Sequence, residues 1–278
     1  MRIKFGIVIL MAFSFAFAQS KKVEKETSAI VEEGKKLYRS EMASWYGSDL
    51  FMEKFADKRS RIGGYFSYTE EGVSKCVFYS KDDQAKTLGV ISFDATYNVD
   101  KANIDARERE LTPLESDLKV LREKTKKEII SDTLFVRYKD TDLNIIPTIE
   151  NGVKKVFILT GPKKNGVMIF GNDYLLTFDE KNNVTSKKRL HKSFLPVEYA
   201  ENSVSGVHSH LPSTGDFITA TDICTLMLYE KFAKWESYMV MSKDYVSIWN
   251  CKTDELTVMT LKAWDKMYDN SNKEKKKE

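Results

Sequence analysis

Residues 206–222 read GVHSHLPSTGDFITATD, and this stretch decides the fold expected for the second half of the chain. The residues up to His210 predict a β-strand, the next eight predict a loop, and Thr219 begins a predicted helix. Side chains alternate between the two faces of a strand, so His208 and His210 point the same way. Asp222 follows in the first turn of the helix. The stretch therefore predicts two imidazoles and a carboxylate close together.

Strands and turns surround this stretch on both sides. The predicted helix spans residues 219–235. Apolar and β-branched runs separated by turn residues predict strands at residues 156–160, 167–170, 174–178, 204–210, 238–241, 245–249 and 256–261. The apolar segment 144–149 contains Pro147, which favours a docking segment over a central strand because proline has no N–H to donate.

The first half of the chain has a different pattern. Helical spacing of apolar residues predicts helices at 27–45 and 48–55, after a polar and mobile segment at 19–27. Thr112, Pro113 and Glu115 form a helix-start signal, which predicts a helix to residue 131. Strands are expected at residues 65–68, 75–79, 87–95 and 132–138.

These elements together predict an α+β fold, with a soft boundary near residue 132. The second part is expected to form a β-sheet flanked by helices, and the first part a smaller α+β unit. The expected segments are a signal peptide at 1–18, an N-terminal helical and β-meander region at 19–131, a second domain at 132–268 and a disordered charged tail at 269–278.

The first eighteen residues resemble a secretory signal peptide. Arg2 and Lys4 precede an apolar run, and residues 16–18 form a small-x-small cleavage site before Gln19. The run is too short to span a bilayer comfortably, and no cysteine follows the cleavage site to carry a lipid. The sequence thus predicts an exported protein, periplasmic or secreted, with no membrane span in the mature chain.

Composition excludes one class of partner. The formal net charge is only +3, from 44 basic and 41 acidic residues, which gives no electrostatic basis for binding nucleic acid. Three cysteines, Cys76, Cys224 and Cys251, allow one disulfide and one free thiol, and the sequence does not assign the pairing. Cys224 and Cys251 are expected to be buried apolar residues.

The clustered histidines and aspartate suit a catalytic zinc ion, which keeps a remaining position for water. A structural alternative exists for each part of the motif. His208 and His210 can line a sheet face and bond to the backbone, and Thr219 with Asp222 can form an ordinary helix capping box.

The order of strand, His-x-His, loop, Thr-x-x-Asp and β-hairpin resembles the JAMM (MPN, JAB-like) metalloprotease family over roughly residues 150–262. The resemblance implies that His208, His210 and Asp222 bind zinc. It also implies that Thr219 helps to stabilise an oxyanion and that the protein hydrolyses a peptide or amide bond. Leu211 stands where the family has proline.

The general base of that family is a glutamate before an apolar strand, and it has no clear counterpart here. Lys154 occupies the aligned position, and Glu150 is the nearest carboxylate. The chain is therefore expected to be a zinc-binding hydrolase of a peptide or protein substrate, with impaired catalysis as one outcome. The alternative is a non-catalytic secreted binding or scaffolding protein of the same fold.

Two further residues have competing interpretations. His191 lies in a basic run, which is typical of a surface position, and its alternative role is a third imidazole near the site. Asp216 is expected to be a turn residue, and its alternative role is a substitute catalytic carboxylate.

Overall fold

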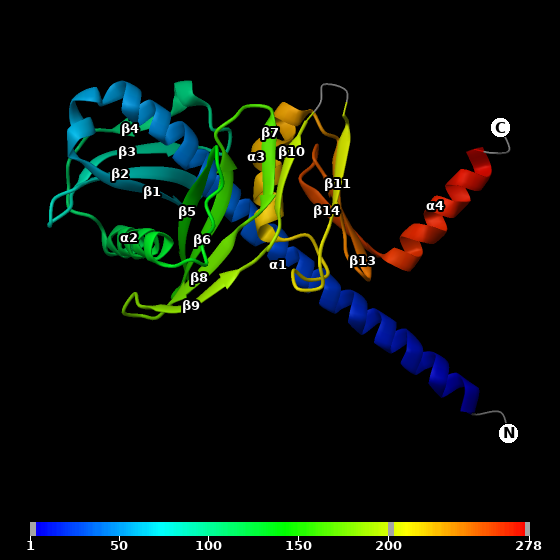
Figure 1. Cartoon of the computed structure of the whole chain (residues 1–278). Coiled ribbons are helices and arrows are strands. Elements are labelled where there is room, and N and C mark those ends of the chain that lie inside the picture. Colours follow the sequence, from blue (N-terminus) through cyan, green and yellow to red (C-terminus); the bar gives the residue numbers. More distant parts are fainter. Residues whose placement is uncertain (1–3, 200–202, 276–278) are drawn as a thin grey trace.

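The computed structural model describes residues 4–199 and 203–275, and it confirms an α+β fold (Figure 1). Four α-helices and fourteen strands are assigned within these ranges. The helices are α1 (Lys4–Lys54), α2 (Pro113–Ser131), α3 (Ala220–Ala233) and α4 (Leu261–Lys275).

The N-terminal sheet is antiparallel and has the order β1-β2-β3-β4. Its strands are β1 (Ile62–Glu70), β2 (Val73–Ser80), β3 (Thr87–Phe93) and β4 (Asn103–Asp105). This sheet contains the predicted β-meander. Helix α2 begins as predicted, because Thr112 accepts a hydrogen bond from the backbone N–H of Glu115 and the Glu115 side chain accepts one in return from the Thr112 backbone.

The central sheet has the antiparallel order β5-β6-β8-β9, and a separate two-stranded sheet joins β10 to β7. The strands are β5 (Thr141–Glu150), β6 (Val153–Pro162), β7 (Val167–Gly171), β8 (Tyr174–Phe178), β9 (Val184–Arg189) and β10 (Phe194–Glu198). Pro147 lies in β5, an edge strand, which is where a sheet tolerates proline.

The last sheet has the order β11-β12-β13-β14. Its strands are β11 (Ser205–Ser209), β12 (Ser237–Met241), β13 (Tyr245–Asn250) and β14 (Glu255–Thr260). Strands β11 and β12 are parallel, and α3 is the crossover between them, whereas the remaining pairs are antiparallel. The parallel arrangement places the end of β11 beside the start of α3.

Helix α1 runs diagonally past both halves of the molecule (Figure 1). Its residues Ala43 and Phe51 belong to the core of the N-terminal sheet. Its residue Leu37 is fully buried in a different cluster, with Phe157 of β6 and Cys224 of α3. The two halves therefore share α1 as a common core element.

The structure corrects several expected elements. Residues 19–55 do not form a mobile segment and two helices, because α1 is continuous to Lys54. Gly47 does not break the helix but allows close packing, since a Cβ there would lie 2.5 Å from Cys76 Cβ. Residues 132–138 are not a strand, because the Asp132 side chain accepts the backbone N–H of Leu134 in a turn. Strands β4, β9 and β10 were not predicted, and the segment 144–149, expected to dock, lies within the edge strand β5.

Both ends of the described chain are helical. Residues 4–18 of the predicted signal peptide form the first part of α1, and residues 1–3 lie outside the described ranges. The tail expected to be disordered continues as α4 to Lys275, and residues 276–278 are not described. Within the described ranges, no helix has the length and apolar character needed to cross a membrane.

All three cysteines are buried and free. This agrees with the expectation that Cys224 and Cys251 are small apolar core residues.

Candidate metal centre

The end of β11 and the start of α3 bring the first two components, His210 and Asp222, together. His210 follows β11, and its backbone N–H donates to the carbonyl of Met241 at 2.8 Å. Asp222 lies in the first turn of α3, where Thr219 is the N-cap. The Thr219 backbone N–H donates to Asp222 Oδ2 at 3.0 Å, and its hydroxyl donates to the same oxygen at 2.7 Å. This capping box fixes the carboxylate in one orientation.

A third imidazole comes from a different part of the chain. His191 lies in the link between β9 and β10, and it is buried rather than on the surface. Its Nδ1 lies 2.8 Å from Asp173 Oδ1, and its backbone N–H donates to the same oxygen at 2.9 Å. The Thr221 hydroxyl donates to Asp173 Oδ2. The buried Asp173 carboxylate therefore fixes His191 against the first turn of α3.

A tight turn between β7 and β8 positions Asp173. Gly171 has a φ of +79°, and a Cβ there would lie 2.4 Å from the carbonyl oxygen of Ser193. Asn172 also has a positive φ, 51°, and its backbone N–H donates to that same carbonyl at 2.7 Å. Only glycine fits the first position without strain or a clash. The turn thus joins the β7–β8 link to the β9–β10 link that carries His191.

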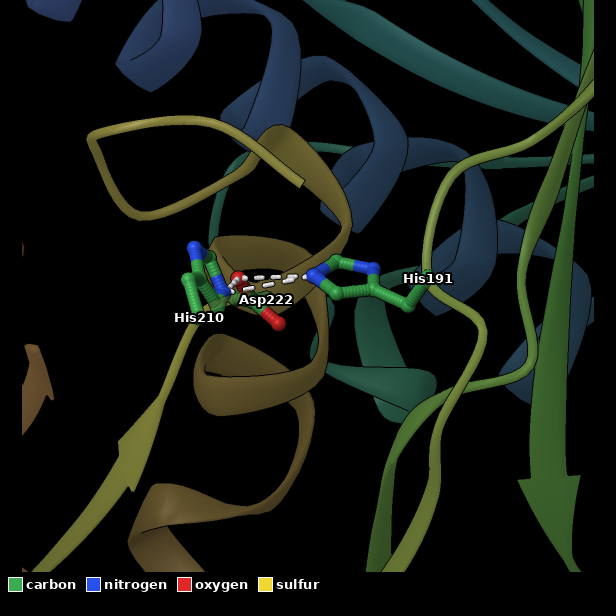
Figure 2. A group of neighbouring side chains, drawn as sticks. All are labelled: His191, His210 and Asp222. Carbon is green, nitrogen blue, oxygen red and sulfur yellow. Dashed lines mark hydrogen bonds and ion pairs between the residues drawn. The ribbon is translucent and has the colours of Figure 1, made fainter. Parts of the chain in front are cut away.

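His191, His210 and Asp222 converge, as Figure 2 shows. The His191 and His210 Nε2 atoms are 3.3 Å apart. Asp222 Oδ2 lies 3.1 Å from His210 Nε2 and 3.7 Å from His191 Nε2. These three buried side chains could hold a metal ion, since each offers a ligand atom within 4.8 Å of the other two.

His208 faces the same carboxylate from the neighbouring position on β11. Its Nε2 lies 3.9 Å from Asp222 Oδ1. Its Nδ1 is 3.0 Å from the Tyr238 hydroxyl. The Nε2 atom is buried and has no hydrogen-bond partner within the described part of the chain. A buried polar atom without a partner is costly, which indicates that the site is shaped for an additional group.

All three imidazoles use Nδ1 for the protein and turn Nε2 toward Asp222. The partner of Nδ1 is Asp173 for His191, the Tyr238 hydroxyl for His208, and the backbone carbonyl oxygen of Phe217, at 3.0 Å, for His210. A hydrogen bond at one ring nitrogen fixes the ring and the tautomer and leaves the other nitrogen available as a ligand.

The charges of the cluster are strongly coupled. Burial alone would raise the pKa of Asp222, but His191 and His210 hold it well below its usual range. Burial lowers the pKa of His191, yet Asp222 and Asp173 outweigh this effect and raise it to about 9. Burial, with the charges of His210 and His191, lowers the pKa of His208 to about 4 despite Asp222. At neutral pH, the metal-free site thus contains a carboxylate and a neutral His208.

Four of the predicted site residues lie together in the structure, and one does not. His208, His210, Thr219 and Asp222 lie together, although the Thr219 hydroxyl is engaged with Asp222. Glu150 is not part of the cluster. It ends β5, and the β5–β6 turn directs its side chain to Lys36 of α1, whose Nζ lies 2.6 Å from Glu150 Oε1.

Lys154 and Asp216 also lie outside the cluster, Lys154 in an ion pair and Asp216 in an exposed loop. The Lys154 ammonium pairs with Asp117 at 2.7 Å and donates to the Asn182 side chain at 2.7 Å. Asp216 is exposed in the loop before α3, as expected for a turn residue. Neither the aligned lysine nor Glu150 supplies a general base.

Asp173 is the component that the sequence did not single out, whereas His191 was expected mainly at the surface, with a third imidazole near the site as the alternative. Neither has a neighbour in sequence that suggests ligation, and the surface interpretation of His191 is wrong because only 4% of its area is exposed. One signal was present in the composition: the chain has three histidines, and all three lie in this cluster.

Comparisons with protein-family models, with curated proteins and with solved structures found no match for this chain.

Proposed function

We propose that this protein is an exported, zinc-dependent hydrolase that acts on a peptide or amide bond. The observation that carries the proposal is that every histidine of the chain directs Nε2 toward Asp222. Imidazole nitrogen and carboxylate oxygen are the ligands of many catalytic zinc sites. Export rests on the signal-like sequence of residues 1–18.

The spacing of the ligand atoms supports zinc. Zinc bonds of 2.0–2.1 Å in tetrahedral geometry place neighbouring ligand atoms about 3.3 Å apart. The three distances among His191 Nε2, His210 Nε2 and Asp222 Oδ2 are 3.1, 3.3 and 3.7 Å. We therefore assign these three side chains as the ligands, and they leave a fourth position free.

A zinc ion in this position would polarise a scissile carbonyl and lower the pKa of a bound water. The residues of the chain have separate tasks. Asp173 holds His191 in its ligating orientation, and Thr219 holds Asp222. His208, whose buried Nε2 lies 3.9 Å from Asp222 Oδ1 without a hydrogen-bond partner among the described residues, would accept a proton beside the metal, in place of the glutamate that the sequence lacks.

The arrangement of elements supports a JAMM-type domain within this proposal. Strand β11 carries His208 and His210 at its end, a loop leads to the capping box of α3, and β12 and β13 form the following hairpin. The same order of strand, loop, helix and hairpin is the basis of the resemblance to the JAMM family. The substrate class, a peptide or protein, comes from that resemblance.

The first test is the zinc content of the purified chain by elemental analysis, with His210→Ala as the matched variant. The expected result is about one zinc ion per chain, lost in the variant, because catalytic zinc sites use three protein ligands and the variant retains only two. Hydrolysis of a quenched-fluorescent peptide library should then require zinc and His208. Absence of zinc after reconstitution would refute the proposal.

A second candidate function is supported by the burial of the site. The side chains of His191, His208, His210 and Asp222 are no more than 7% exposed. Closed sites with four protein ligands are typical of structural zinc, and His208 would then be the fourth ligand of a secreted binding or scaffolding protein. His208→Ala separates the candidates. A structural site loses zinc, whereas a catalytic site keeps zinc and loses hydrolysis.

A further inference from the structure

A cleft of about 810 Å³ lies between the two halves of the molecule, away from the histidines. It is bounded by α1, α2, the β5–β6 hairpin and the last turns of α3. Phe232, at the α3 end of the cleft, is about 15 Å along the helix from Asp222. A cleft of this volume, located where structural units meet, is typical of small-molecule sites.

One wall of the cleft is aromatic and open to solvent. Trp45 of α1 is 40% exposed and Phe232 of α3 is 56% exposed. Their rings stack with centroids 6.2 Å apart, and Trp45 also contacts Tyr229 at 6.2 Å. Large aromatic side chains rarely remain exposed in a group without a partner to cover them.

A carboxyl group lies among these aromatic residues. Glu41 of α1 lines the cleft and accepts a hydrogen bond from Asn144 Nδ2 at 2.7 Å. Burial raises the pKa of Glu41 to about 7, although Asn144 and Arg122 oppose the shift. The carboxylate is therefore poorly compensated, and a cation bound beside it would be favoured.

The two lysines that line the cleft are paired with aspartates, whereas Arg122 acts on Glu41 through its charge and keeps Nε without a hydrogen-bond partner among the described residues. Lys163 pairs with Asp142 at 2.8 Å, and Lys164 pairs with Asp140 at 2.9 Å. The Arg122 guanidinium donates from Nη1 to the carbonyl of Ile145 at 2.7 Å. It also lies 4.7 Å from the centroid of the Tyr65 ring.

We infer that this cleft binds a small organic ammonium ion with an apolar body. The ammonium group donates to the Glu41 carboxylate, and the apolar body lies against Trp45 and Phe232. Aromatic faces attract cations as well as apolar surface, so one wall recognises both parts of such a ligand. This inference does not depend on the metal centre.

Calorimetric titration of the full chain with 2-phenylethylamine tests the inference, and 3-phenylpropionate serves as an anion of similar size. The amine should bind, and the carboxylate should bind at least tenfold more weakly. Glu41→Gln should weaken amine binding at least tenfold, whereas Glu150→Gln, at a surface carboxylate outside the cleft, should leave it unchanged.

Trp45→Ala provides a second variant at a partly exposed position, and it should also weaken the amine at least fivefold. Thermal melting of each variant confirms that it is folded. Equal affinity for the amine and the carboxylate overturns the inference. So does an undetectable amine affinity, or an amine affinity that both cleft variants leave unchanged.

Discussion

Replacing Asp173 with asparagine tests the metal centre through a residue that does not itself touch the metal. Asp173 Oδ1 and Oδ2 lie 2.8 and 2.9 Å from His191 Nδ1, and the Thr221 hydroxyl donates to Oδ2. Asparagine keeps the volume and one acceptor but removes the negative charge. The His191 ring then loses its charged partner while the surrounding packing is retained.

The expected loss of zinc affinity follows from the role of Asp173 in orienting His191. A carboxylate that orients a metal-bound imidazole contributes a factor of about 10–100 to metal affinity. This corresponds to about 1.4–2.7 kcal/mol at 25 °C. Asp173→Asn should therefore weaken zinc binding 10–100-fold. Thr221→Val removes only one hydrogen bond to Asp173, and its effect should be smaller and in the same direction.

Competition titration with a chromophoric zinc chelator measures this change directly. Asp142→Asn is the matched control, because Asp142 forms an exposed ion pair with Lys163. Circular dichroism verifies that Asp173→Asn is folded. If the folded Asp173→Asn protein binds zinc as tightly as the parent protein, His191 is not a ligand oriented by Asp173, and the assignment fails.

Four other changes have defined outcomes. Zinc affinity should rise with pH up to about 9, because the pKa of His191 is raised to about 9 and the ring must lose its proton to bind metal; affinity titrations from pH 6 to 10 check this. Glu150→Gln should leave zinc content unchanged and alter stability by no more than about 1 kcal/mol, as is usual for an exposed pair such as Glu150 with Lys36; elemental analysis and urea unfolding measure both. Gly171→Ala should lower the free energy of unfolding by about 1–2 kcal/mol or more and weaken zinc, because alanine is strained at a φ of +79°; a parent protein and variant of equal stability would contradict this. The pKa of Glu41, raised to about 7, means that the folded state holds a proton that the unfolded state releases above pH 4.5, so stability should fall between pH 4.5 and 7, and this fall should be absent in Glu41→Gln.

Local sequence signals predicted the parts of the structure that depend on neighbouring residues. The start of α2 follows from Thr112 and Glu115, which are close in sequence and bond directly. The shared direction of His208 and His210 follows from strand alternation, and the position of Asp222 follows from the helix start. Each of these features is set within a few residues.

The parts that sequence did not predict depend on contacts between distant segments. Asp173 and His191 meet because the β7–β8 and β9–β10 links lie side by side, and neither link has a periodic pattern. Residues 132–138 have strand propensity, yet Phe135 is buried in a core cluster and the segment has no strand partner. Tertiary packing overrides local propensity in such cases.

Helix α1 packs in the cores of both halves, so it cannot be fully buried until both halves are present. Helix α1 is synthesised before the sheets, but Leu37 lies in the same core cluster as Cys224 of α3, which is synthesised much later. The apolar side of α1 therefore stays uncovered until most of the chain exists, and closing so long a loop slows folding. The face of α1 that contains Leu37 is therefore the surface that a holding chaperone would cover until the rest of the chain is made.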